Sequence, residues 1–128
     1  MFQIAQDNSV RLSRGDYVVF SCFINAGNKL TLRRYTLNAD NEARKGDILY
    51  FAIMEPNHKF EDAIVKKTFT ADSPTNEFGD TLIELKPEDT ENLLTGLYYY
   101  TVKLQRFADD GSYYVDTIIP DRRFVIED

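Results

Sequence analysis

The chain is dominated by short runs in which apolar and polar residues alternate, the pattern of half-buried β-strands. The clearest run extends from Leu97 to Leu104, where Tyr, Tyr, Val and Leu occupy every second position. A second aromatic run starts at Tyr113 after the turn residues 109–112, and their Asp-Gly pair predicts a hairpin because glycine adopts the positive φ that such turns need. Pro120 interrupts the return strand and predicts a bulge or a stretch of edge, since proline cannot donate to a ladder.

Earlier segments continue the all-β pattern. The further predicted strands are 9–12, 16–25, 48–55, 63–70 and 81–86. The second and third of these are nearly continuous apolar runs, which is typical of central strands covered on both faces. Lys66 and Lys67 suit an edge strand, where charge discourages pairing with another chain, although Ile64 and Val65 break the alternation there. Gly-Asp recurs directly before three of the strands and is typical of turns.

One short helical turn near 87–94 is the only helical signal, with Pro87 at its start and acidic residues after it. Tyr98 follows Gly96 by two at the entry to the clearest strand, which predicts a tyrosine corner whose hydroxyl bonds back to the preceding turn. The chain is therefore predicted to be all-β, an immunoglobulin-like antiparallel β-sandwich of about 7–9 strands. Residues 1–128 are expected to form a single domain.

Composition narrows the function classes without selecting one. The formal net charge of −6 argues against binding to nucleic acid or to an anionic membrane. No apolar stretch approaches the length that spans a bilayer, and the first ten residues show no secretory signal. Cys22 is the only cysteine, so an internal disulfide is excluded and a reducing compartment is expected.

Catalytic chemistry has little support in the sequence. His58 is the only histidine, which excludes zinc sites that need two histidines from one chain, and we predict that it lies exposed in a loop. Residues 38–42 resemble the front of a calcium loop but lack its glycine and its final glutamate. The tripeptide 14–16 is Arg-Gly-Asp, which turn chemistry already explains. No catalytic, metal-binding or cofactor-binding residue is predicted.

Apolar residues also occupy the side of the predicted strands that faces away from the core positions, and they indicate an interaction surface. They are Leu97, Tyr99, Tyr17, Val19 and Phe23. These side chains cannot all fill one core together with the alternate positions. Exposed in the monomer, they would form an apolar patch of the kind that marks a protein interface.

Two other function classes stay open. Tyr113 and Tyr114, with Tyr35 and Tyr50, could provide stacking platforms in a carbohydrate-binding sandwich that recognises a host cell-surface or cell-wall glycan, although the chain has no tryptophan. A hydrolase with paired carboxylates is a third class, for which the acidic residues are numerous enough but no motif exists.

Several stretches, taken in order, resemble a family of small phage and prophage virion proteins from Gram-positive hosts, which is similar to the N-terminal immunoglobulin-like domain of the phage baseplate upper protein. The stretches are Leu12-x-Arg14-Gly15-Asp16, the runs 50–57 (YFAIMEPN) and 60–63 (FEDA), Pro87-Glu88-Asp89-Thr90 through Gly96-Leu97-Tyr98-Tyr99-Tyr100, and the run 116–120 (DTIIP). The likeness covers nearly the whole chain, and its motifs are patterns of turns and core.

The resemblance implies a non-enzymatic structural part of a phage tail or baseplate, such as an adaptor or decoration protein. Its partners would be other tail proteins or further copies of itself, with no cofactor. It would be made in the bacterial cytoplasm and carried out in the virion. Baseplate upper proteins continue into regions that lead to receptor binding, whereas this chain ends beside its last predicted strand.

Overall fold

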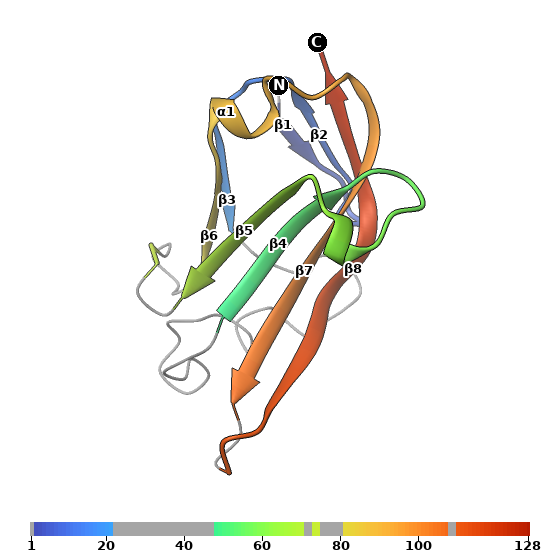
Figure 1. The fold of residues 1–128 in the computed structure, drawn as a ribbon. Helices are drawn as coiled ribbons and strands as arrows, with labels where there is room; N and C mark the ends of the chain where they lie inside the picture. The colour runs from blue at the N-terminus through green and yellow to red at the C-terminus, as the bar shows by residue number, and fades with distance from the viewer. Residues whose placement is uncertain (1, 22–47, 71–72, 75–80, 108–109) are drawn as a thin grey trace.

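The fold was analysed in a computed structural model, which describes residues 2–21, 48–70, 73–74, 81–107 and 110–128 (Figure 1). Several residues singled out above lie outside these ranges: Cys22, Phe23, Tyr35 and the segment 38–42. The strands of the described part are β1 (Phe2–Ile4), β2 (Val10–Ser13), β3 (Val18–Ser21), β4 (Ile48–Met54), β5 (Val65–Thr70), β6 (Leu82–Leu85), β7 (Gly96–Phe107) and β8 (Tyr113–Glu127). Two short helices accompany them, the 3-10 helix η2 (Phe60–Asp62) and α1 (Pro87–Thr90).

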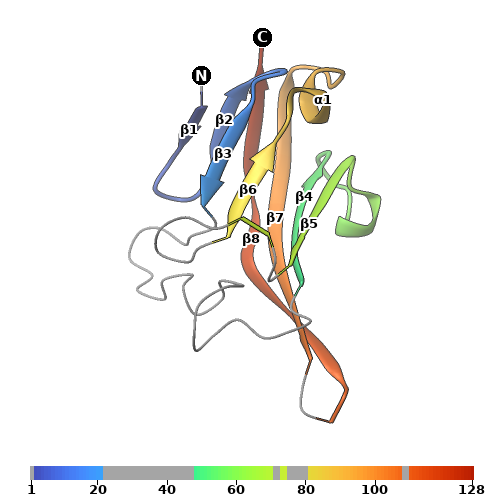
Figure 2. The same ribbon diagram turned by 90° about the vertical axis from the view of Figure 1, so that its left-hand side faces the viewer.

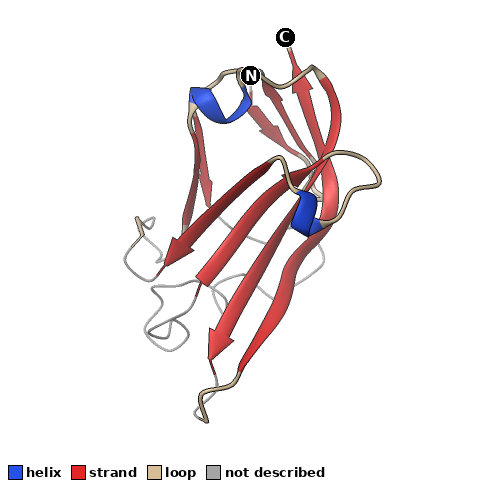
Figure 3. Cartoon of the chain, in the orientation of Figure 1, coloured by secondary structure: helices blue, strands red, loops and turns tan. Residues whose placement is uncertain are grey.

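The strands form two sheets packed face to face, so the predicted all-β sandwich is confirmed (Figure 3). The larger sheet has the order β1-β2-β8-β7-β4-β5, and β3 pairs with β6 in the smaller one. Figure 2 shows β3 and β6 in front of the larger sheet. This arrangement is immunoglobulin-like, and β7 occupies the place of the strand that carries the tyrosine corner in such domains.

One pairing departs from the predicted antiparallel arrangement. β2 runs parallel to β8, with Val10 opposite Phe124 and Leu12 opposite Ile126. The chain leaves β2 at the turn around Gly15 and crosses into the other sheet as β3. Because β2 is not joined to β8 by a hairpin, it can add to the edge of β8 in either direction.

The turn from β2 to β3 explains the Arg-Gly-Asp tripeptide. Asp16 donates its backbone N–H to the Ser13 carbonyl at 3.1 Å, and Gly15 has φ +81°. Gly15 also donates to the Thr90 hydroxyl at 2.9 Å, while the Arg14 side chain pairs with Asp128. The tripeptide is thus bound into the protein's own turn. The Gly-Asp pairs at 46–47 and 79–80 lie outside the described residues.

The core lies between the sheets and contains Tyr98, Tyr100, Val102 and Leu104 of β7, as the alternation predicted. Phe51 of β4 is fully buried at its centre. Its ring lies 6.0 Å from Phe20, 5.6 Å from Tyr100 and 6.4 Å from Phe124, measured between centroids. Phe20 belongs to the smaller sheet, whereas Tyr100 and Phe124 belong to the larger one. The aromatic cluster therefore joins the two sheets.

Pro120 lies at a bulge, as its chemistry predicted. Tyr100 pairs with Arg122 and Val102 with Ile119, so two residues of β8 face Thr101 alone. The buried Thr101 hydroxyl donates to the Ile119 carbonyl at 2.8 Å, next to this irregularity in the ladder. β8 continues through the proline as one strand.

The edge strand β5 shows that its two lysines have different roles. Lys66 lies on the outer face, with its ammonium 4.5 Å from the centroid of the Phe60 ring. Lys67 instead donates to the Glu84 carbonyl at 2.8 Å and to an Asp89 carboxylate oxygen at 2.7 Å. The two lysines do lie on an edge strand, as the sequence indicated, since β5 ends the larger sheet, and Lys67 in addition joins β5 to β6 and α1.

Candidate functional site

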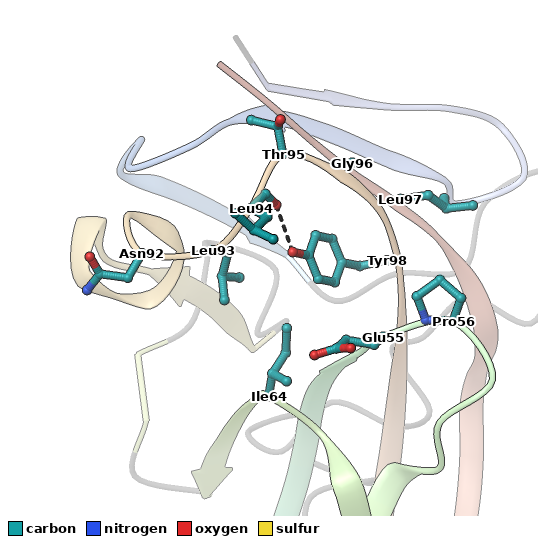
Figure 4. A pocket seen from close by; sticks show the side chains of 10 residues that line it. All are labelled: Glu55, Pro56, Ile64, Asn92, Leu93, Leu94, Thr95, Gly96, Leu97 and Tyr98. Carbon is teal, nitrogen blue, oxygen red and sulfur yellow. Dashed lines mark hydrogen bonds between the residues drawn. The ribbon is translucent and has the colours of Figure 1, made fainter.

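A groove of about 400 Å³ opens at the end of the sandwich where α1 leads into β7 (Figure 4). We call it the Leu94 groove. It is lined by Glu55, Pro56, Ile64, Asn92, Leu93, Leu94, Thr95, Gly96, Leu97 and Tyr98. One wall comes from the two ends of the segment that connects β4 to β5, and the other from the loop that enters β7. Two chain segments distant in sequence therefore build it together.

The loop wall is held by hydrogen bonds from three directions. The Tyr98 hydroxyl donates to the Leu94 carbonyl at 2.7 Å, the contact that a tyrosine corner predicts (Figure 4). The Leu93 carbonyl accepts from the Arg14 guanidinium at 3.4 Å, and the Leu93 N–H donates to the Thr90 carbonyl at 3.0 Å. The loop is thus fixed in place although its side chains are exposed.

Exposed apolar side chains gather in this groove. Leu94 is 79% exposed, and Ile64 and Leu97 are 38% and 39% exposed. Single exposed apolar residues are ordinary, but several that converge on one concavity are typical of interaction sites. The groove therefore offers an apolar surface that the fold itself does not bury.

Among the lining residues, Glu55 is the only one with an acidic or basic side chain, and it directly follows β4. Figure 4 shows its carboxylate between Ile64 and Tyr98, within the groove. No described residue donates a hydrogen bond to this carboxylate or forms an ion pair with it. A single acceptor of full negative charge thus lies among apolar walls.

We expect Tyr98→Phe to lower the free energy of unfolding by about 1 kcal/mol, because it removes the hydroxyl from the Leu94 carbonyl and leaves the ring in place. Urea denaturation monitored by circular dichroism measures this loss. Tyr113→Phe is the matched control, because that ring is 62% exposed, and its effect should stay within about 0.5 kcal/mol. Equal effects of the two variants would contradict the corner's contribution.

The predicted interface residues do not form one patch, which corrects that expectation. Leu97 lines the Leu94 groove, and Tyr99 lies half-buried on the outer face of the larger sheet, opposite Arg123. Tyr17 precedes β3 and Val19 lies on the outer face of the smaller sheet, opposite Glu84. The two groups are therefore on opposite sides of the sandwich. Phe23 lies outside the described residues.

Tyr17 already has a partner within the chain. Its hydroxyl donates to a Glu84 carboxylate oxygen at 2.6 Å, and this hydrogen bond raises the pKa of Tyr17 above its usual value. This hydrogen bond restrains the exposed ring and reduces its freedom to turn towards a partner protein. Tyr17 is thus a weaker interface candidate than Leu97.

The tyrosines proposed for glycan stacking are also separated. Tyr113 is strongly exposed near the tip of the β7–β8 hairpin, which extends past β4 and β5 in Figure 1. Tyr50 instead packs edge-on against Phe60, with ring centroids 6.1 Å apart, under the helix η2. Only the backbone of Tyr114 is described, and Tyr35 lies outside the described residues. Of the four tyrosines proposed for stacking, the structure shows one strongly exposed ring, Tyr113, and no pair of rings within the described residues.

His58 is exposed in the loop after β4, as predicted, and its Nδ1 lies 3.1 Å from the Pro56 carbonyl. It lines a shallow hollow with Tyr99 and Asp121. Within the described ranges, no three His, Cys, Asp or Glu side chains are grouped so that they could hold a metal ion. No helix in the same ranges is long and apolar enough to cross a membrane.

The sequence pattern did not identify three residues of the groove as site residues: Glu55, Ile64 and Leu94. Ile64 did leave a signal, because Ile64 and Val65 together break the alternation of the predicted strand 63–70. The structure explains this break, since β5 begins only at Val65 and the Ile64 side chain belongs to the groove. Leu94 was assigned to the helical turn, which in the structure ends earlier.

Comparisons with known proteins give no relative. No protein-family model matches the chain. Searches of the curated proteins and of the solved structures return no match either.

Proposed function

We propose that the protein is a non-enzymatic structural or interaction module of a bacteriophage or prophage tail, acting as a baseplate-associated adaptor or decoration protein. Its partners would be other tail proteins, with self-association as a second mode. It would be made in the cytoplasm of the bacterial host and carried in the virion.

The observation that carries the interaction role is the Leu94 groove, where Leu94, Ile64 and Leu97 stay exposed and hydrogen bonds hold the loop that carries Leu94 in place. A rigid sandwich that presents such a surface is suited to docking, because little order is lost when a partner binds. The tail assignment rests on the resemblance of the stretches from Leu12 to Pro120 to small virion proteins. The immunoglobulin-like fold agrees with that resemblance but is shared by many unrelated functions.

Mass spectrometry of phage particles purified after inducing the source strain tests the proposal. We expect the protein in constant ratio to the tail proteins across particle preparations. Cross-linking of the same particles then identifies its neighbours. Absence from the particles, despite expression in the same lysate, would refute the tail assignment.

One observation favours the alternative of a glycan-binding module, namely the exposed ring of Tyr113 on the protruding hairpin. Stacking of a sugar on this ring would be lost in Tyr113→Ser, whereas Tyr17→Ser on another face would leave it unchanged. A glycan panel at millimolar sugar, measured with the wild-type protein and both variants, tests for this stacking. No binding by the wild-type protein would eliminate the alternative.

A further inference from the structure

We propose that the Leu94 groove binds a segment of a partner protein that presents a lysine or arginine beside a large apolar residue. This inference rests on the proposed role as an interaction module and adds the chemistry of the partner to it. It does not depend on the assignment to a phage tail.

The apolar part of the recognition follows from the walls. Figure 4 shows Ile64 on one side of the groove, with Leu93 and Leu94 on the loop opposite to it. Together with Leu97 they leave apolar surface in contact with water that an incoming aliphatic or aromatic side chain would cover. A volume of about 400 Å³ is at the small end of ligand pockets, and it admits side chains of a segment rather than a folded element.

The charged part follows from Glu55. A purely apolar occupant would remove water from this carboxylate and give it no partner, which is unfavourable. An acidic occupant would meet like charge, and the chain's net charge of −6 adds to that repulsion. A lysine or arginine satisfies both features, because its alkyl stem covers apolar surface while its charged head reaches a carboxylate.

The groove's polar groups are otherwise engaged or peripheral. The Tyr98 hydroxyl already donates to the Leu94 carbonyl, and the Leu93 carbonyl already accepts from Arg14. Glu55 therefore remains as the acceptor that selects the occupant's charge. The fixed loop also means that binding orders little of this protein, so the affinity comes from the contacts themselves.

Selection of a random 12-residue peptide library on the immobilised full chain tests the inference. We expect the enriched peptides to share a lysine or arginine adjacent to Leu, Ile, Val or Phe. An enriched peptide, labelled with a fluorophore, should then bind Glu55→Gln about tenfold more weakly by fluorescence anisotropy. Leu94→Ser should weaken it by a similar factor or more, through the lost apolar contact.

Matched variants separate groove binding from general charge attraction. Glu88→Gln removes an exposed carboxylate outside the groove lining and should leave the affinity unchanged. Glu55→Lys should reverse the preference and enrich peptides with Asp or Glu at the basic position, a readout that a merely structural role would not produce. Because Glu55 is exposed, these variants should unfold at the same urea concentration as the wild-type protein.

Three results would overturn the inference: no enrichment over the Leu94→Ser protein, enriched peptides without a basic residue, or binding that Glu55→Gln leaves unchanged. Self-association that Glu55→Gln abolishes in sedimentation would make a second copy of the chain the occupant, and that result would also overturn the inference. If the peptide selection fails, the tail assignment is still tested by mass spectrometry of the particles. The two proposals can therefore fail separately.

Discussion

Phe51→Ala is expected to lower the free energy of unfolding by about 4 kcal/mol, the largest effect of any single substitution considered for this protein. Phe51 is fully buried and contacts aromatic rings from both sheets, Phe20 on one side and Tyr100 and Phe124 on the other. Its removal leaves a cavity that two packed sheets cannot close. Urea denaturation, with fluorescence and circular dichroism as independent probes, measures the loss.

Phe51→Leu provides the graded control for this prediction. It keeps most of the buried volume and should cost about 1.5 kcal/mol, which leaves the protein folded even if the alanine variant is not. Ile64→Ala removes an apolar side chain that is 38% exposed at the groove and should cost less than the leucine variant does. Equal losses for Phe51→Leu and Ile64→Ala would contradict the central position of Phe51.

Asp89→Ala is expected to cost about 2 kcal/mol, because one carboxylate serves two donors. Its Oδ2 accepts from the Lys86 backbone N–H at 2.7 Å, which caps α1, and from the Lys67 ammonium at 2.7 Å. Both partners of the ion pair are about four-fifths buried, so the alanine variant leaves the ammonium with the Glu84 carbonyl as its remaining acceptor among the described residues. Chemical denaturation of the variant measures the cost.

A double-mutant cycle with Lys67→Met isolates the ion pair from the cap. Each single variant removes the pair, but Lys67→Met leaves the bond from Lys86 to Asp89 intact and should cost about 1 kcal/mol. The combined variant should cost less than the sum of the two single losses. Additive losses would show that the pair itself contributes nothing and that the cap carries the effect.

Much of the fold follows from local pattern. Alternation in β7 predicted which tyrosines face the core, because side chains of a strand alternate between faces whatever the neighbours are. Gly96 and Tyr98 predicted the tyrosine corner for the same reason, since turn and strand lie within a few residues of each other. Pro120 predicted its bulge through the missing N–H group.

Other features depend on pairings that no local pattern contains. The parallel contact of β2 with β8 joins residues more than a hundred positions apart, and alternation is the same for either direction of a neighbour. Lys67 lies on an edge strand as predicted, but its contacts could not be predicted because its partners, Glu84 and Asp89, come from the other sheet and α1. The outward apolar residues were predicted to form one patch, but the outer faces of β3 and β7 lie on opposite sides of the sandwich.

The sequence by itself therefore determined the all-β class, most strand positions, the inward faces and the corner at Tyr98, because each depends on residues near one another along the chain. Only the tertiary structure decided where an interaction surface forms. Glu55 and Ile64 precede and follow one loop, while Leu94 and Leu97 lie some thirty residues later. Their convergence on the Leu94 groove depends on how the loops at one end of the sandwich come together, and that is set by the packing of the two sheets.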